Sequence, residues 1–214
     1  MVEQVIFPDD ITNQHGDAHT GVSYVSPLFG AIALELADPN PENTGLFSHF
    51  VWNAAVQLAV FLEDPQPTSG GTTHGDWEWG VAGKEVLELG AGTGLAGLLA
   101  ALKGARRVVI TDYPAAEVLE NLRKNVAKNI DTRRRIDTDD VSVAGTEVVK
   151  LEIGDVSVAG HEWGVLTDPF SKKEKENFDR ILVADCLWSM CFPLPYPRPR
   201  PRPLSLSLFV ALSK

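Results

Sequence analysis

The stretch of sequence that most constrains the fold is residues 84–114, KEVLELGAGTGLAGLLAALKGARRVVITDYP. Residues 85–89 and 107–111 are short apolar segments, the second of them β-branched, and both predict strands. Between them lie a glycine-rich turn and an Ala- and Leu-rich run that ends near Gly104, which predicts a helix. A strand, a helix and a strand in this order form a βαβ unit, which joins two parallel strands of one sheet.

The alternation of strands and helices continues along the chain. Residues 115–129 predict the next helix, residues 146–153 a third strand and residues 178–185 a fourth. Residues 48–64 begin with Ser48, a candidate N-cap, and carry apolar residues nearly all round, which predicts a helix that is buried on most sides. We therefore predict an α/β fold with a parallel sheet.

The glycine turn favours one kind of ligand over another. Gly90, Gly92 and Gly94 are spaced G-x-G-x-G, whereas the turn that binds a nicotinamide or flavin dinucleotide is spaced G-x-G-x-x-G and would have its third glycine at Leu95. Glu88 precedes the first glycine by two residues. This acid favours a ligand with a positively charged ammonium group over one with a pyrophosphate.

An acidic residue after the second strand completes the pattern. Asp112 lies about 20 residues after the first glycine, where an acid accepts hydrogen bonds from both hydroxyls of a ribose. A nucleoside that carries an ammonium group and no phosphate describes S-adenosylmethionine. Taken alone, the glycines are also explained by a tight turn in an ordinary α/β protein. The combined order of strand, Glu88, glycines, helix, strand and Asp112 favours the cofactor.

Composition and charge exclude several functional classes. The 214 residues are 44% hydrophobic and 22% charged, as in soluble globular proteins, and no apolar run reaches the roughly 18 residues that span a bilayer. The net charge of −10 argues against a surface that tracks nucleic-acid phosphates and favours a cationic partner. Without a visible secretory signal, we expect a cytoplasmic protein, and we expect a monomer. Cys186 and Cys191 have neither redox nor zinc spacing, and we expect no metal site.

Five motifs occur in an order that resembles a known family. They are WNAA, VLELGAGTG, TDYP, WG and ADCLW, and the likeness extends over roughly residues 25–189. The chain resembles the lysine methyltransferase group of the seven-stranded S-adenosylmethionine-dependent methyltransferases, in particular its fungal branch. That branch is often labelled nicotinamide N-methyltransferase-like, and it includes the enzyme that methylates the N-terminal glycine and adjacent lysine of elongation factor 1-alpha. The resemblance implies the Rossmann-like parallel sheet of the class I methyltransferases, with S-adenosylmethionine as the cofactor.

The resemblance also implies which residues bind the cofactor. Trp52 would lie beside it, although a tryptophan on an apolar helix is, without the family, more often a core residue. The turn would line the methionine end, Asp112 would bind the ribose, Trp163 would lie against the adenine, and Ala184 would lie under the cofactor. The implied cofactor site comprises Trp52, Gly90, Ala91, Gly92, Asp112, Trp163 and Ala184.

Two further residues would be catalytic. Asp185 and Trp188 match the family's motif after the fourth strand, an acid followed three residues later by an aromatic residue, which faces the incoming amine. In this interpretation Asp185 attracts the substrate ammonium and accepts its proton, and Trp188 offers a π face to the cation. Many relatives have Tyr at this second position. From the sequence alone, Asp185 is equally compatible with a residue that makes a turn at the strand end.

Three functions are therefore open. The first is an N-methyltransferase that acts on an amine of a protein with a basic or amine-bearing segment, either a lysine or an N-terminal amine, with elongation factor 1-alpha as a candidate. The second is a methyltransferase that acts on nicotinamide or a similar small base. The third is a catalytically inactive remnant. DCLW stands where nucleic-acid amine methyltransferases often carry an N/D-P-P-Y/F loop, so we expect no nucleic-acid substrate. Because no apolar run is long enough to span a bilayer, we also expect no membrane partner.

The C-terminal sequence raises the third alternative. PLPYPRPRPRP carries proline at every second position from Pro193 to Pro203, which is incompatible with helix interiors and central strands. The family's remaining three strands would need more residues than 186–214 provide. We therefore expect a sheet that is complete only through about the fourth strand. The abrupt change in composition fits a change of reading frame or splice pattern after Met190.

These observations divide the chain into three parts. Residues 1–47 are mixed and turn-rich, and we expect a loose N-terminal cap that carries little chemistry. Residues 48–192 form the methyltransferase domain, which we expect to be truncated. Residues 193–214 form a Pro/Arg-rich tail that does not belong to the fold.

Overall fold

The structure of the chain is a computed structural model, and it describes residues 4–10, 12–17, 20–38, 48–63, 80–133, 153–175 and 177–184. Its central sheet has four parallel strands in the order β8-β7-β6-β9. The chain runs outward from the first of these strands, β6, through β7 to β8, and then returns to place β9 on the other side of β6. This arrangement confirms the predicted α/β fold with a Rossmann-like parallel sheet. The strands are β6 (Glu85–Leu89), β7 (Arg107–Asp112), β8 (Asp155–Gly160) and β9 (Arg180–Val183).

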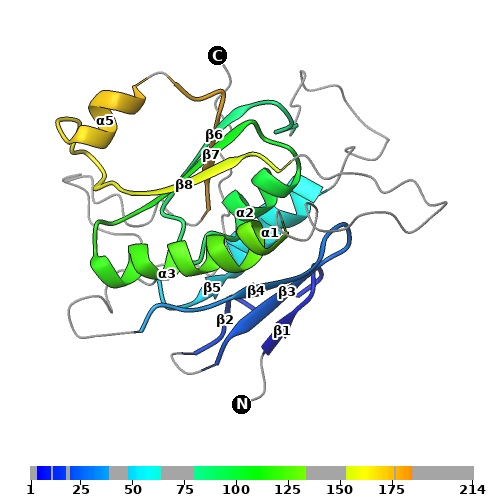
Figure 1. Cartoon of the computed structure of the whole chain (residues 1–214). Coiled ribbons are helices and arrows are strands. Elements are labelled where there is room, and N and C mark those ends of the chain that lie inside the picture. Colours follow the sequence, from blue (N-terminus) through cyan, green and yellow to red (C-terminus); the bar gives the residue numbers. More distant parts are fainter. Residues whose placement is uncertain are drawn as a thin grey trace, which may run out of the picture.

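Three helices lie between this sheet and a smaller N-terminal sheet (Figure 1). They are α1 (Asn53–Glu63), α2 (Leu95–Leu102) and α3 (Ala116–Val126). Every residue of α2 is buried, because this helix packs against both the parallel sheet and α1. The helix α3 continues directly into one turn of π-helix, η2 (Ala127–Asp131). A short helix, α5 (Pro169–Glu174), follows β8 and precedes β9 along the chain. Within the described ranges, no helix has the length and apolar character that a membrane span requires.

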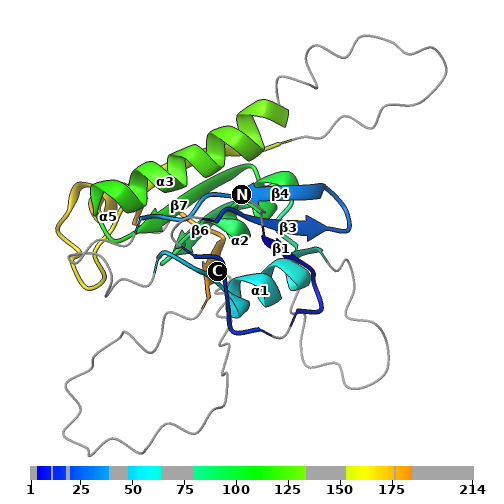
Figure 2. The same cartoon turned by 90° about the horizontal axis from the view of Figure 1, so that it is seen from below.

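The N-terminal segment forms an ordered layer and not the loose cap that the sequence predicts. Its three strands are β1 (Gln4–Ile6), β3 (Val22–Ser26) and β4 (Gly30–Leu34), in the order β1-β3-β4. Figure 2 shows β3 and β4 in front of α2, with α3 on one side and α1 on the other. Alternating residues of this sheet point into the shared core, because successive side chains of a strand face opposite sides. Those with no exposed surface are Ile6, Val22, Tyr24, Ile32 and Leu34.

A buried carboxylate joins this layer to α1. Glu63, in the last turn of the helix, is only 6% exposed. One of its oxygens accepts a hydrogen bond from the Tyr24 hydroxyl at 2.6 Å, and the other accepts one from the Ser26 hydroxyl. Both partners lie on β3, so the carboxylate is satisfied on both oxygens without water.

The helix predicted over residues 48–64 begins later than its candidate N-cap, Ser48. Val51 and Trp52 form a short strand, β5, which pairs antiparallel with β2 (Gln14–His15). This pairing keeps the backbone extended up to Trp52, and α1 starts at Asn53. The N–H of Asn53 donates to the carbonyl of Asn13 at 2.9 Å, which extends the contact by one residue.

The third parallel strand also lies elsewhere than predicted. The strand that pairs with β7 is β8, Asp155–Gly160, which begins two residues after the predicted range 146–153 ends. Of the predicted range, only Ile153 belongs to the described residues. In β8, Asp155 and Ser157 are exposed while Val156 and Val158 are half-buried, the period-two pattern of a strand with one face toward solvent.

Candidate active site

Three of the predicted cofactor residues, Gly90, Asp112 and Ala184, lie at the carboxyl ends of parallel strands. In register, Leu89 at the end of β6 lies beside Val183 at the end of β9, and Asp112 at the end of β7 lies beside Gly160 at the end of β8. Gly90 and Ala184 follow directly on neighbouring strands. The strand order reverses between β6 and β9, and ligands of open α/β sheets bind outside the carboxyl ends of the strands at such a switch point.

The glycine turn has the backbone conformation that its sequence predicts. Gly92 has φ +57° and Gly94 has φ +83°, in the left-handed region that L-residues with a Cβ rarely adopt. The N–H of Ala91 donates to the carbonyl of Thr111 at 3.0 Å, and the N–H of Gly94 donates to the carbonyl of Ala91 at 2.8 Å. The turn is thus attached to the end of β7 and closed on itself before α2 begins.

Asp112 lies against this turn. Its Oδ2 accepts a hydrogen bond from the Gly92 N–H at 2.7 Å, and its Oδ1 accepts one from the Tyr113 N–H at 2.7 Å. Burial raises the pKa of the Asp112 carboxyl above its usual value, while these two N–H groups oppose that shift. An ionised carboxylate has about four acceptor positions, so both oxygens can still accept hydrogen bonds from ribose hydroxyls.

The structure gives Glu88 a role other than the one inferred from its position. The side chain is 3% exposed, and its Oε2 accepts a hydrogen bond from the N–H of Gly97 in the first turn of α2, at 2.9 Å. The N-cap residue of this helix, Gly94, has no side chain to make such a bond. Glu88 therefore caps α2 from the neighbouring strand, and its carboxylate faces the helix and not the ammonium of a ligand.

Burial dominates the ionisation of Glu88. It raises the pKa of this carboxyl from 4.5 to about 8, and the nearby negative charge of Asp112 adds to the shift, while the hydrogen bonds from Gly97 and Ala96 oppose it. Glu88 and Asp112 lie on adjacent strands near the same turn. The negative charge of Asp112 therefore makes ionisation of Glu88 less favourable.

An aromatic segment before α1 forms a wall beside the turn. The rings of Phe50 and Trp52 meet edge to face with centroids 5.9 Å apart, and the rings of His49 and Phe50 lie 4.4 Å apart. A Cβ added to Gly92 would lie 4.0 Å from the carbonyl oxygen of Phe50, so the glycine leaves this approach open. Trp52 follows Phe50 by two residues, and its place beside the cofactor stays a prediction.

One buried acceptor lies in the same segment. The Oδ1 of Asn53 is buried and has no hydrogen-bond partner within the residues that the structure describes. An unsatisfied buried acceptor is costly, and a donor on a bound ligand would relieve that cost. The open glycine turn, the buried carboxylate of Asp112, the aromatic wall and this acceptor together fit S-adenosylmethionine, which carries an ammonium group, ribose hydroxyls and an aromatic base.

Of the remaining predicted residues, the structure describes Trp163 and Ala184. Trp163 lies in the turn after β8, where the N–H of His161 donates to the carbonyl of Asp112 at 2.8 Å. Ala184 follows β9 and packs against the hydrophobic core. The predicted catalytic residues, Asp185 and Trp188, lie outside the described residues.

Sequence reasoning missed a further residue at the turn. Asn125 of α3 is fully buried and donates a hydrogen bond to the carbonyl of Thr93 at 3.0 Å. The available signal was the spacing of Asn121, Asn125 and Asn129, which places three amides on one face of a helix. Asparagine is a weak helix former, so a repeat of this kind inside a helix indicates that the side chains have partners.

Comparisons with known proteins agree with these features. A family model described as lysine methyltransferase matches residues 40–192. The protein N-terminal and lysine N-methyltransferase of Gibberella zeae is 30% identical over 167 residues, which are 73% of this chain and 51% of that protein. The protein of the same name from Cryptococcus neoformans is 30% identical over 78% of this chain and 45% of its own length. A protein-lysine methyltransferase of Mus musculus is 32% identical, over 71% of this chain and 49% of its own length.

The chain spans about half the length of the curated relatives that it matches. The matched region contains the glycine turn, Asp112, the aromatic segment and all four parallel strands. The family resemblance inferred from the five motifs is thereby confirmed. This chain belongs to the lysine methyltransferase family.

Proposed function

We propose that the protein is an S-adenosylmethionine-dependent N-methyltransferase that acts on an amine of a protein substrate. The observation that carries the proposal is the meeting of Gly92, Asp112 and the aromatic segment 49–52 at the switch point of the sheet. The family membership and the names of the relatives support the same reaction. Bound S-adenosylmethionine supplies the methyl group that the reaction transfers to nitrogen.

Each residue of the site has a chemical task in this proposal. The glycine turn lets the methionine end of the cofactor approach the backbone without meeting a Cβ. The carboxylate of Asp112, already oriented by the N–H groups of Gly92 and Tyr113, accepts hydrogen bonds from the ribose hydroxyls. Trp52 and Trp163 supply aromatic faces, and Ala184 supplies a small side chain beneath the ligand.

The substrate amine must be neutral before it can attack a methyl group. A lysine ammonium has a reference pKa near 10.4 and an N-terminal ammonium one of about 7.7–8.0, so a lysine needs more assistance to lose its proton. We assign this task to Asp185, with Trp188 holding the cation against its ring. Positioning contributes most of the remaining acceleration, up to about 7–11 kcal/mol for well-oriented reactants.

The proposed substrate is a lysine or an N-terminal amine in a basic segment of a protein. The net charge of −10 supports a cationic partner, and the relatives are named for both kinds of amine. Elongation factor 1-alpha, which the family resemblance implies, is the first candidate. A peptide of its N-terminal residues and a second peptide with the N-terminal amine acetylated would separate the two kinds of amine.

A transfer assay with labelled S-adenosylmethionine and a cell extract tests the proposal. One labelled protein band is the expected result, and the same band must be absent with an Asp112→Ala variant. Label that appears only in small molecules would overturn the protein substrate and favour a nicotinamide-like base. Cofactor binding without transfer to any acceptor would identify the chain as an inactive remnant.

A further inference from the structure

Two asparagines of the α3–η2 helix bind the backbone of the N-terminal sheet in the same way. The amide of Asn129 accepts a hydrogen bond from the Ala33 N–H at 3.1 Å and donates one to the Ala33 carbonyl at 2.8 Å. The amide of Asn125 accepts from the Glu35 N–H at 2.7 Å and donates to the Glu35 carbonyl at 3.0 Å. Each amide therefore pairs with the edge of β4 and its extension as a neighbouring strand would.

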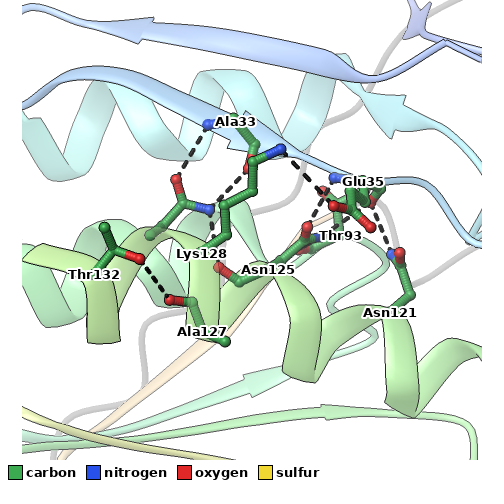
Figure 3. Close-up of polar contacts among 9 residues, drawn as sticks. Ala33, Glu35, Thr93, Asn121, Asn125, Ala127, Lys128 and Thr132 are labelled. Carbon is green, nitrogen blue, oxygen red and sulfur yellow. Dashed lines mark hydrogen bonds and ion pairs between the residues drawn. The ribbon is translucent and has the colours of Figure 1, made fainter.

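The two asparagines differ in the third hydrogen bond of the side chain. Figure 3 shows the contact that only Asn125 makes, with Thr93. The Nδ2 group of Asn125 also donates to the carbonyl of Thr93 at 3.0 Å, whereas that of Asn129 donates to the carbonyl of Asn125 within its own helix at 2.9 Å. Thr93 lies between Gly92 and Gly94 in the glycine turn and is 2% exposed. Asn125 thus connects the helix, the N-terminal sheet and the turn through one fully buried side chain.

This contact holds a part of the turn that β7 does not hold. From β7, Asp112 and Thr111 bind the N–H groups of Gly92 and Ala91. Asn125 comes from α3 and binds a carbonyl of the turn, that of Thr93. Glycine residues have the largest conformational freedom to lose, and a turn that is already fixed avoids paying that cost when a ligand binds.

We propose that Asn125 is a positioning residue for the cofactor, which acts by fixing the carbonyl of Thr93 in the glycine turn. The same amide binds Glu35, so docking of the N-terminal sheet and binding of the cofactor stabilise each other, as any coupling between two sites must be reciprocal. This inference rests on the proposed function, since it assigns the turn to S-adenosylmethionine.

The matched variants Asn125→Ala and Asn129→Ala test the proposal. Both remove one clamp on the N-terminal sheet, but only Asn125→Ala releases Thr93. We expect the dissociation constant for S-adenosylmethionine, measured by calorimetry, to rise about three- to tenfold in Asn125→Ala, as for loss of one hydrogen bond. In Asn129→Ala the dissociation constant should stay within about twofold of the wild-type value. Circular dichroism at the assay temperature verifies that both variants are folded. If Asn125→Ala does not fold, Asn125→Leu replaces it, because leucine keeps the side-chain size, carries no charge and cannot bind Thr93.

Hydrogen exchange supplies a readout that needs no activity. Without cofactor, the amides of Gly92 and Gly94 should exchange faster in Asn125→Ala than in either Asn129→Ala or the wild type. Adding S-adenosylmethionine should slow exchange of the Ala33 amide in the wild type and not in Asn125→Ala, although the bond from that amide to Asn129 is retained. This difference reports the coupling and not the stability of the sheet alone.

The outcomes separate the two proposals. If both alanine variants weaken binding equally, or if the turn amides exchange alike in both, Asn125 is only a clamp for the sheet and the positioning role is overturned. If the wild-type protein does not bind S-adenosylmethionine, the proposed function fails, and the positioning role toward this cofactor fails with it. Wild-type binding with a selective loss in Asn125→Ala supports both.

Discussion

The carboxylate of Asp112 and the N–H of Gly92 form a 2.7 Å hydrogen bond between the end of one strand and the turn after its neighbour. The bond fixes the acid that is proposed to bind the ribose relative to the turn that is proposed to hold the methionine end. It therefore joins the two halves of the proposed cofactor site. The second oxygen of Asp112 is bound by the Tyr113 N–H, so both oxygens point in set directions.

Replacing Asp112 by Asn should weaken cofactor binding strongly. An amide can still accept from the Gly92 N–H, but its NH₂ group then faces the N–H of Tyr113, donor against donor, and one acceptor for the ribose is lost. We expect the dissociation constant for S-adenosylmethionine to rise at least about tenfold, equivalent to about 1.4 kcal/mol. Calorimetry measures this dissociation constant. Asp38→Asn is the control, because the side chain of Asp38 is exposed. Equal affinities of the two variants for S-adenosylmethionine would show that Asp112 does not bind the cofactor.

Asp185→Ala should abolish methyl transfer and leave cofactor binding intact. The proposed task of this acid is to orient the substrate ammonium and accept its proton, which contributes about 10²–10⁴-fold in general acid–base catalysis. Turnover of a labelled protein substrate and the dissociation constant for the cofactor are measured on the same preparation. Asp185→Asn keeps the size of the side chain and removes its charge, so comparing it with Asp185→Ala separates these two contributions to turnover. Loss of turnover and of binding together would reassign Asp185 to the cofactor site or to the fold.

Local sequence was enough to predict the part of the fold that is proposed to hold the cofactor. The strands at residues 85–89 and 107–112 and the glycine turn between β6 and α2 depend on neighbouring residues only, through apolar runs and positive φ angles. The start of α1 depends on Val51 pairing with His15 far away in the sequence, and no local pattern encodes such a pairing. The same holds for the N-terminal sheet, where β1 pairs parallel with β3.

The direction of a side chain was harder to predict than its position. Glu88 precedes the glycines, as in a ligand-binding acid, but packing of α2 against β6 turns its carboxylate toward Gly97. A Cβ on Gly97 would lie 2.5 Å from that carboxylate, so the small residue and the acid form one unit. Asn125 reaches Thr93 only because α3 packs against β7 while its continuation, η2, packs against α2. Both contacts follow from tertiary packing, which a single sequence does not display.

Gly92→Ala should remove cofactor binding at a small cost in stability. Gly92 and Gly30 both have positive φ angles, +57° and +72°, so alanine strains the backbone at either position by about 1 kcal/mol. Only at Gly92 does the new Cβ enter the space between the turn and the carbonyl of Phe50. Chemical denaturation should show similar losses for Gly92→Ala and Gly30→Ala, whereas calorimetry should show lost binding for Gly92→Ala alone. Retained binding in Gly92→Ala contradicts the proposed cofactor position.

Tyr24→Phe should destabilise the protein through the joint between β3 and α1. Its hydroxyl donates to the buried carboxylate of Glu63, and its removal leaves that oxygen without its donor. The expected loss in the free energy of unfolding is about 1–3 kcal/mol. Tyr113→Phe is the matched control, because Tyr113 is 43% exposed and the change should stay within about 0.5 kcal/mol. Urea denaturation measures both, and equal values would show that the joint contributes nothing.

Glu88 should make the stability of the protein fall as the pH rises. Burial raises the pKa of Glu88 from its ordinary value of 4.5 to about 8 in the folded state. Between pH 4.5 and pH 8 the folded state therefore binds more protons than the unfolded state. The free energy of unfolding therefore decreases by up to about 1.4 kcal/mol per pH unit from pH 4.5 toward pH 8 and levels off above it. In Glu88→Gln this contribution is absent, because glutamine does not titrate and its oxygen still accepts from the Gly97 N–H. Urea denaturation at several pH values should show Glu88→Gln gaining stability relative to the wild type as the pH increases. A difference that is independent of pH would mean that Glu88 ionises normally in the folded protein.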